Sequence, residues 1–490
     1  MVGQKAKTGK RVALTVIRGG APPRTTGALR SPVPHRPGPV ELAGDMAEIF
    51  ALSLLRDHPA RSLADPHVET RIDRRTRFTL HELLCELRNL PWFDARHMAE
   101  AMEPAAQSSG AEGDPGHRRS LHWNGDGQLT LRTLQRCGVA LPEDETGASA
   151  LWREDNAGVA GPCEAVPTGD APMSAWVAWC AGQSGAGLRV PGLSPEPIVP
   201  ETPGALADAL PRIPAARPFH NAALAALARG ALSVSAPSAC DLWTGPRLFA
   251  VMAEAERHAR RMAQEQVARL DRLSRPAVTA ARMTLWLARE EREAAPAHAE
   301  YRAAAEMLAE HAPGLLHWVS RANAARRGLR RRGLALFLPL AGVRSLEHTP
   351  SDTAAHAVVA GALGTLLKAV LWHAPQPLHR IGAAAPAQEV DLLMRDIARA
   401  RVMSAACLPS EAFADLRLGQ AIALSVLREA MERDNRSARL AFRDLDGRAL
   451  VLQAHPRHFG RGFAELRAEG QPVAWPQESA PPAAHLTQVV

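Results

Sequence analysis

The chain is poor in lysine, has no paired cysteines and lacks a long apolar run. Only four of its 58 basic residues are lysines, so a site beyond the N-terminus that needs a lysine must use Lys368. The six cysteines occur singly, without metal-site spacing, which is typical of reduced thiols. No apolar stretch approaches the roughly 20 residues of a membrane-spanning helix, and the run at 12–17 is too short for a signal-peptide core. We therefore expect a cytoplasmic protein with no membrane partner.

The excess of positive charge is small and spread along the chain. The formal net charge is +7 over 490 residues, and arginines alternate with acids along most of the sequence. A nucleic-acid-binding protein typically gathers its basic residues on one face or stripe. The observed pattern is typical of a solvated surface instead, so we expect no nucleic-acid partner. Hydrophobic residues make up 46% of the chain, which indicates a globular protein with a large core.

Apolar residues recur at helical spacing, whereas the alternation typical of strands is almost absent. Composition divides the chain into a flexible N-terminal arm at 1–38, a helical region at 39–240, a helical bundle at 241–436, and a β-hairpin with a mobile tail at 437–490. Long loops are predicted at 103–118 and 154–218, where Gly, Pro, Ser and Asp are dense. The hairpin is predicted from Asp446 and Gly447, a strong turn signal between two apolar runs.

The spacing predicts helices over 44–57, 79–90, 94–102, 206–210, 219–232, 246–273, 277–293, 297–312, 316–327, 354–372, 387–407 and 412–433. Val267, Asp271 and Arg275 are spaced i, i+4 and i+8, so on one helix Asp271 could pair with Arg275. His356 follows a helix-start sequence at 349–352. The positive end of the helix dipole there disfavours the imidazolium, and a neutral imidazole can act as a general base.

Three segments of the bundle carry a resemblance to a known family. They are 253–282 (AEAERHARRMAQEQVARLDRLSRPAVTAAR), 338–368 (LPLAGVRSLEHTPSDTAAHAVVAGALGTLLK) and 396–427 (DIARARVMSAACLPSEAFADLRLGQAIALSVL). Their order and separation resemble the signature segments of the algal-type vanadium-dependent haloperoxidases and their bacterial relatives, with weaker similarity over most of 41–452. The resemblance implies an all-α fold, with helical bundles of the vanadium haloperoxidase and acid phosphatase type, long loops and a small C-terminal β-hairpin. We also expect a homodimer.

The vanadate site of that family is incomplete in this chain. The family binds vanadate through one histidine and holds it with a lysine, two arginines, a serine and a glycine amide, while a second histidine serves acid–base chemistry. The resemblance assigns Arg275 and Arg401 to the two arginines and His356 to the acid–base histidine. The other positions are Val267 for the lysine, Ala354 for the serine, Ala355 for the glycine and Cys407 for the ligand histidine. We therefore expect no vanadate, no other metal or cofactor, and no halogenation.

Haloperoxidase-like proteins with a decayed vanadate site also occur in bacterial pathways to prenylated naphthoquinone meroterpenoids of the napyradiomycin kind, and this chain resembles them. The resemblance implies a cofactor-independent isomerase that rearranges an α-hydroxyketone by shifting a prenyl group on a prenylated aromatic or quinone substrate. His356 would be the base, with Arg275 and Arg401 as donors to the carbonyl and the developing oxyanion. The residues expected to line the substrate site are Asp271, Ser274, Ser351 and Cys407.

The same residues leave other interpretations open. A non-catalytic haloperoxidase-like scaffold or partner protein is the main alternative, and a haloperoxidase with an altered site is a third. His356 could cap its helix, Arg275 and Arg401 could be structural ion-pair partners, and Cys407 could be a small buried apolar residue. Formation of an isomer by the purified protein distinguishes the isomerase from the scaffold, and retention of vanadium after dialysis would favour the haloperoxidase.

Overall fold

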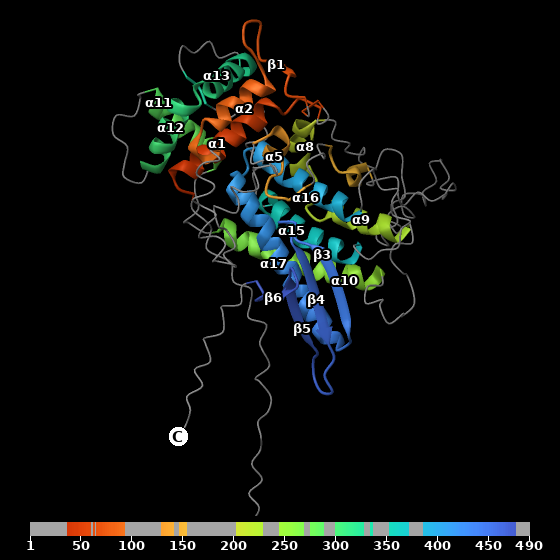
Figure 1. Ribbon diagram of the computed structural model, residues 1–490. Coiled ribbons are helices and arrows are strands. Elements are labelled where there is room, and N and C mark those ends of the chain that lie inside the picture. Colours follow the sequence, from red (N-terminus) through yellow and green to blue (C-terminus); the bar gives the residue numbers. More distant parts are fainter. Residues whose placement is uncertain are drawn as a thin grey trace, which may run out of the picture.

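The computed structural model of the protein describes about half of the first predicted helical region, most of the helical bundle and the C-terminal sheet. The described residues are 37–59, 62–63, 65–93, 129–141, 147–153, 202–228, 245–268, 275–288, 299–327, 334–336, 352–371 and 386–476. They are mostly helical, and a small antiparallel sheet lies at the lower end of the molecule (Figure 1). The predicted all-α class with a C-terminal β element is confirmed. No helix in these ranges is long and apolar enough to cross a membrane.

The helices fall into two groups along the chain. The first comprises α1 (Pro39–Leu54), α2 (Leu80–Arg88), α5 (Leu131–Leu134), α8 (Pro203–Ala209) and α9 (Arg217–Ala228), with short 3-10 turns η2 (Pro91–Phe93), η3 (Ala150–Arg153) and η4 (Leu210–Arg212). The second comprises α10 (Gly245–Val267), α11 (Pro276–Leu287), α12 (Ala299–His311), α13 (Pro313–Arg327), α15 (Asp352–Leu371), α16 (Pro386–Met403) and α17 (Pro409–Asp434). Most predicted helices are therefore confirmed, with ends that differ by a few residues.

The upper part of the molecule is built around α1, which is buried over most of its length and packs on α12 and α13 (Figure 1). A two-stranded hairpin, β1 (Glu69–Arg71) and β2 (Arg77–Thr79), precedes α2 and was not predicted. Helix α2 begins with a capping box: Thr79 Oγ1 accepts from the Glu82 amide (3.2 Å), and Glu82 Oε2 accepts from the Thr79 amide (2.6 Å). Two of the free amides at the helix start are thereby satisfied.

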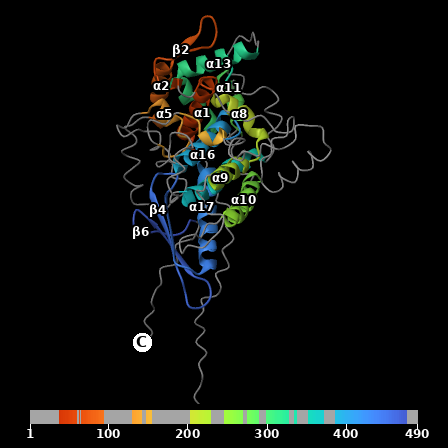
Figure 2. The ribbon, with the colours of Figure 1, turned by 90° about the vertical axis from the view of Figure 1, so that its right-hand side faces the viewer.

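The central helix is α15, whose side chains from Ala355 onward are all buried. It packs on α10, α16 and α17, and the side view shows α17 between α10 and the sheet (Figure 2). A β-carbon added to Gly361 would lie 2.0 Å from the Leu416 carbonyl oxygen, and one on Gly419 would lie 2.2 Å from the Val358 carbonyl oxygen. Backbone therefore meets backbone where α15 crosses α17, and only glycine fits at these two positions.

The sheet has the order β3 (Ala438–Arg443), β4 (Ala449–His455), β5 (Phe463–Ala468) and β6 (Gln471–Pro472), all antiparallel. The turn between β3 and β4 contains Gly447 with a φ of +80°, as the Asp-Gly signal predicts. Buried Leu440 pairs with buried Leu452 across β3 and β4, so one face of the sheet packs on the bundle. The predicted hairpin is confirmed, and the sheet continues into β5 and into the start of the predicted mobile tail.

Two predictions of continuous structure are wrong. The helix predicted over 246–273 ends at Val267, and Arg275 has an extended backbone (φ −52°, ψ 148°) just before α11. Pro276 accounts for the extended backbone of Arg275, because the ring of a proline disfavours helical geometry in the preceding residue. Val267 and Arg275 therefore do not share one helix face. Within the predicted loop 154–218, α8 and η4 occupy 203–212, where a short helix over 206–210 was also predicted, and α9 begins at Arg217. The ranges 154–201, 103–118 and 94–102 lie outside the described residues.

Candidate functional site

His356 lies in the second turn of α15 with 3% of its surface exposed. Its Nε2 atom is 2.7 Å from the carbonyl oxygen of Ile213, which follows η4. A carbonyl oxygen can only accept a hydrogen bond, so Nε2 carries the proton. In the neutral imidazole the basic lone pair is therefore on Nδ1. The segment before α9 thus fixes both the orientation of this ring and its tautomer.

Arg401 lies at the end of α16 and is 2% exposed. Its Nη1 donates to Asp415 Oδ2 on α17 at 2.9 Å. Its Nε is buried and has no hydrogen-bond partner among the described residues. Burial acts to lower the pKa of this guanidinium, but the effects of Cys407, Asp415 and Glu411 outweigh burial and raise it. Arg401 is therefore a permanent cation with one donor available.

Arg401 and His356 are held by different neighbours. Asp415, the partner of Arg401, precedes Leu416 on α17, and the Leu416 carbonyl lies against Gly361 of α15. Gly361 is five residues after His356, which corresponds to about 7.5 Å along the helix axis and about 140° around it. His356 therefore does not share the face of α15 that meets α17 at Gly361, and its ring contacts Ile213 instead.

Cys407 follows α16 and is 1% exposed. Its charge acts to raise the pKa of Arg401 and also that of Cys137. Burial and the nearby Glu48 carboxylate raise the pKa of the Cys137 thiol, so that thiol stays protonated at neutral pH. The role of Cys407 as a residue that binds substrate stays a prediction.

The remaining predicted site residues are exposed or not described. The Arg275 side chain is exposed at the start of α11, a helix that packs on α12 in the upper part of the molecule. Arg275 was predicted to donate to the carbonyl and the developing oxyanion of the substrate, and a guanidinium that does so in a dry pocket would be buried. The exposed position of Arg275 does not support that role. Three further predicted residues, Asp271, Ser274 and Ser351, lie outside the described residues.

The described residues do not fit vanadate. Val267, at the position of the family lysine, is an apolar side chain that is 41% exposed at the end of α10. The position of the ligand histidine holds the buried thiol of Cys407, and Ala355 is a buried residue where the family has glycine. Among the described residues no group of three or more His, Cys, Asp or Glu side chains could hold a metal ion. We therefore propose no reaction step in which vanadate takes part.

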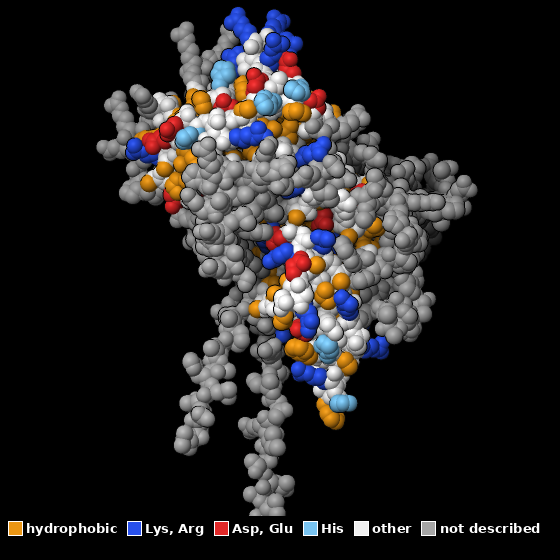
Figure 3. Space-filling view, in the orientation of Figure 1, with side chains coloured by type: hydrophobic (Ala, Val, Ile, Leu, Met, Phe, Trp, Pro, Cys, Tyr) orange, Lys and Arg blue, Asp and Glu red, His pale blue; other side chains and the backbone are white. Residues whose placement is uncertain are grey.

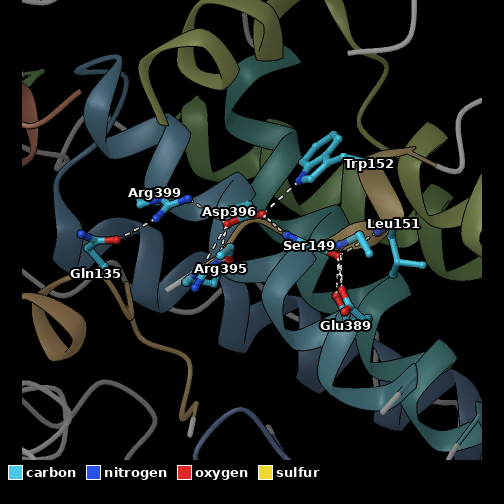
Figure 4. A network of polar contacts seen from close by, with 10 residues as sticks. Gln135, Ser149, Leu151, Trp152, Glu389, Arg395, Asp396 and Arg399 are labelled. Atoms are coloured by element: carbon cyan, nitrogen blue, oxygen red, sulfur yellow. Dashed lines mark hydrogen bonds and ion pairs between the residues drawn. The ribbon is translucent and has the colours of Figure 1, made fainter. Parts of the chain in front are cut away.

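A second buried polar cluster, not predicted from the sequence, lies on α16 (Figure 4). Asp396 is fully buried and accepts from Arg395 Nε (3.1 Å), Arg399 Nη2 (3.0 Å), the Ser149 amide (2.8 Å) and Trp152 Nε1 (3.0 Å). Burial, together with the neighbouring Arg395, lowers the pKa of Arg399 to about 10. Both Asp396 oxygens have partners, so this cluster fixes η3 on α16 and is structural.

The ion pair between Arg401 and Asp415 was also not predicted, although the positions of the two residues in the sequence favour it. The two residues are 14 positions apart, on consecutive helices joined by a short turn. A carboxylate near the start of one helix is well placed to meet an arginine at the end of the preceding helix. By contrast, no local signal reveals that Ile213 accepts from His356 across 143 positions.

Comparison with known proteins supports the fold and goes no further. No family model matches the chain, and no curated protein matches it. Among solved structures the chain is similar to the homohexameric second vanadate-dependent bromoperoxidase (AnII) from Ascophyllum nodosum, with a TM-score of 0.55 and 15% sequence identity. The match covers 90% of this chain and 74% of that chain. At this identity the likeness shows the fold alone, which is of the vanadium haloperoxidase type.

Proposed function

We propose that this protein is a cofactor-independent isomerase that rearranges an α-hydroxyketone by a 1,2-shift of a prenyl group. The proposed substrate is a prenylated naphthoquinone-derived precursor of a meroterpenoid. The observation that carries the proposal is that the bundle buries both a histidine of defined tautomer, His356, and an arginine, Arg401, whose Nε has no hydrogen-bond partner among the described residues. A base and an oxyanion donor are what this rearrangement needs, and they do not require the missing vanadate ligands.

The reaction conserves atoms and electrons. Nδ1 of His356 takes the proton of a tertiary alcohol, and the oxygen re-forms a carbonyl as the bond to the prenyl carbon breaks. The prenyl group moves with that bonding pair to the adjacent carbonyl carbon, and the electrons of the carbonyl bond pass to its oxygen. The imidazolium then returns the proton to the new alkoxide. No electrons enter or leave, so the product is an isomer of the substrate.

Arg401 would stabilise the oxygen on which negative charge develops. Asp415 holds one end of the guanidinium, so the orientation of Nε is set before substrate binds. A donor fixed in advance in a site without water contributes more than the same donor in water. The resemblance alone assigns Arg275 as a second donor and Asp271, Ser274, Ser351 and Cys407 to the substrate site.

The first test compares His356→Ala with a matched control, His220→Ala. His220 lies on α9, is partly buried, and is 3.9 Å from Glu256, so its removal also deletes an imidazole from the helical core. We expect His356→Ala to lower kcat by about 10²–10⁴-fold, as for loss of a general base, and His220→Ala to leave kcat unchanged. Circular dichroism melting curves establish that both variants are folded.

Three results contradict the proposal. They are absence of isomer formation by the wild-type protein, unchanged turnover in folded His356→Ala, and an equal loss in both variants. Arg401→Lys keeps the charge but removes the planar donor, so we expect kcat to fall by about 10²-fold with little change in KM. The absence of isomer formation would favour the scaffold interpretation.

A further inference from the structure

The loop between β4 and β5, residues 456–462, projects from the lower end of the molecule and is here called the finger. Its base is fixed on the C-terminal end of α17. Asn435 Nδ2 donates to the Arg457 carbonyl oxygen (2.8 Å), and Asn435 Oδ1 accepts from the Arg457 amide (2.7 Å). The Gly462 amide donates to the Glu432 carbonyl oxygen (2.8 Å). Both ends of the finger are therefore held, which limits the entropy that its tip would lose on binding.

The tip of the finger presents an aromatic side chain to solvent. Phe459 is 93% exposed, and Phe463 at the base is 39% exposed, with the Arg457 guanidinium 5.5 Å from its ring centroid. Gly460 has a φ of +82°, which turns the chain sharply behind Phe459. Figure 3 shows apolar, basic and histidine side chains at this end of the molecule. Among the large apolar side chains of the described residues Phe459 is the most exposed, and the next is Val278 at 43%.

The finger itself contains Arg457, His458 and Arg461 and no acidic residue. Glu429, on α17, forms an ion pair with Arg461 (Oε1–Nη1 3.7 Å), which balances part of this positive charge, and its side chain is 26% exposed. The tip thus combines one aromatic ring with flanking cations, the pattern that suits an interface between hydrocarbon and anionic headgroups.

We propose that the finger binds the surface of an anionic lipid bilayer, with Phe459 inserted between headgroups and Arg457 and Arg461 beside lipid phosphates. A stable protein–protein interface buries about 1,000 Å² or more, which a convex tip of seven residues does not offer. Nucleic-acid binding needs several phosphate contacts along a stripe, and the finger is a point. One aromatic ring and two arginines give weak, reversible association. The contact is with the surface of the bilayer, whereas the sequence alone led us to expect no membrane partner.

The test is sedimentation of the full chain with vesicles of phosphatidylcholine alone and with vesicles that also contain phosphatidylglycerol. We expect binding only to the anionic vesicles, weakened by added salt. Phe459→Ser should lower the partition coefficient by about tenfold, because the buried ring is lost. Arg457→Gln with Arg461→Gln should lower it by about twenty-five-fold, since each arginine near an anionic surface contributes about fivefold.

Matched controls come from the other end of the molecule. Leu285→Ser removes an apolar side chain that is 39% exposed on α11, and Arg74→Gln with Arg75→Gln removes two exposed cations between β1 and β2. Both should bind vesicles as the wild type does. The proposal is overturned if the wild type ignores anionic vesicles or if the controls lose as much binding as the finger variants. It is also overturned if light scattering shows that Phe459→Ser changes the oligomeric state while vesicle binding is unaltered.

Discussion

Replacing Lys368 by methionine should cost about 3–5 kcal/mol of unfolding free energy, the range for removal of one partner of a buried ion pair. Lys368 is 1% exposed on α15. Its Nζ donates to Asp391 Oδ1 on α16 (2.6 Å) and to the Asp444 carbonyl oxygen beside the β3–β4 turn (3.3 Å). One ammonium group therefore joins the central helix, a neighbouring helix and the sheet.

The pH dependence of this loss follows from Asp391. Burial raises its pKa to about 6, although the Lys368 ammonium acts to lower it. Because the pKa is 3.8 in the unfolded chain, the folded state binds the proton more tightly. The contribution of Asp391 to the free energy of unfolding is complete below about pH 3.8 and is lost as the pH rises through about 6. In Lys368→Met the pKa of Asp391 should rise further, so the loss of stability extends to higher pH.

The assay is urea unfolding of the wild type, Lys368→Met and the double variant Lys368→Met/Asp391→Leu at pH 5 and pH 7. The single variant should be more destabilised at pH 7 than at pH 5. The double variant should recover most of the loss at pH 7, because apolar residues of similar volume often replace a buried ion pair at little cost. The reasoning is refuted if the single variant loses under about 1 kcal/mol, or if the double variant is less stable than the single one.

Further variants test the packing, the buried cluster, the capping box and the incomplete vanadate site. Gly419→Ala should cost about 3 kcal/mol or more in urea unfolding, because the new carbon meets backbone, whereas Gly364→Ala meets the movable Met394 thioether and should cost less. Asp396→Asn should cost about 3–5 kcal/mol in the same assay, since it leaves two buried arginines without a carboxylate. Thr79→Ala should cost about 1 kcal/mol through loss of the cap, again by unfolding. Cys407→His should show no tight vanadate binding by calorimetry, because the lysine and glycine of the family site are still absent; tight binding would mean that the site is assigned wrongly.

The helical fold could be predicted from the sequence because its signals are local. Apolar periodicity located α15, α16 and α17 to within a few residues, and the Asp-Gly pair located the β3–β4 turn. The start of α11 was predicted to within one residue, but the helical spacing of Val267, Asp271 and Arg275 concealed that α10 ends at Val267. Strand β5 was not predicted, although Ala464, Leu466 and Ala468 alternate with polar residues, because the segment is short and pairs with β4 to complete the sheet.

The site was less predictable because its contacts join distant segments. The resemblance pointed to His356 and Arg401, and both are buried in the bundle. The partner that fixes the His356 ring is a backbone carbonyl 143 positions away, which no residue type reveals. The buried cluster of Asp396 draws its donors from α16 and from residues near 150, a separation of well over 200 positions. Only the packed structure shows which arginines are satisfied and which retain a donor.

The central claim is tested most directly by incubating the purified protein, treated with a chelator, with a prenylated naphthoquinone precursor that contains an α-hydroxyketone. The products are analysed by mass spectrometry and by carbon NMR. The account predicts a product of unchanged mass in which the prenyl group has moved to the adjacent ring carbon, formed by the wild type and nearly absent with His356→Ala. A substrate recovered unchanged, or a product with altered mass or added halogen, would contradict it.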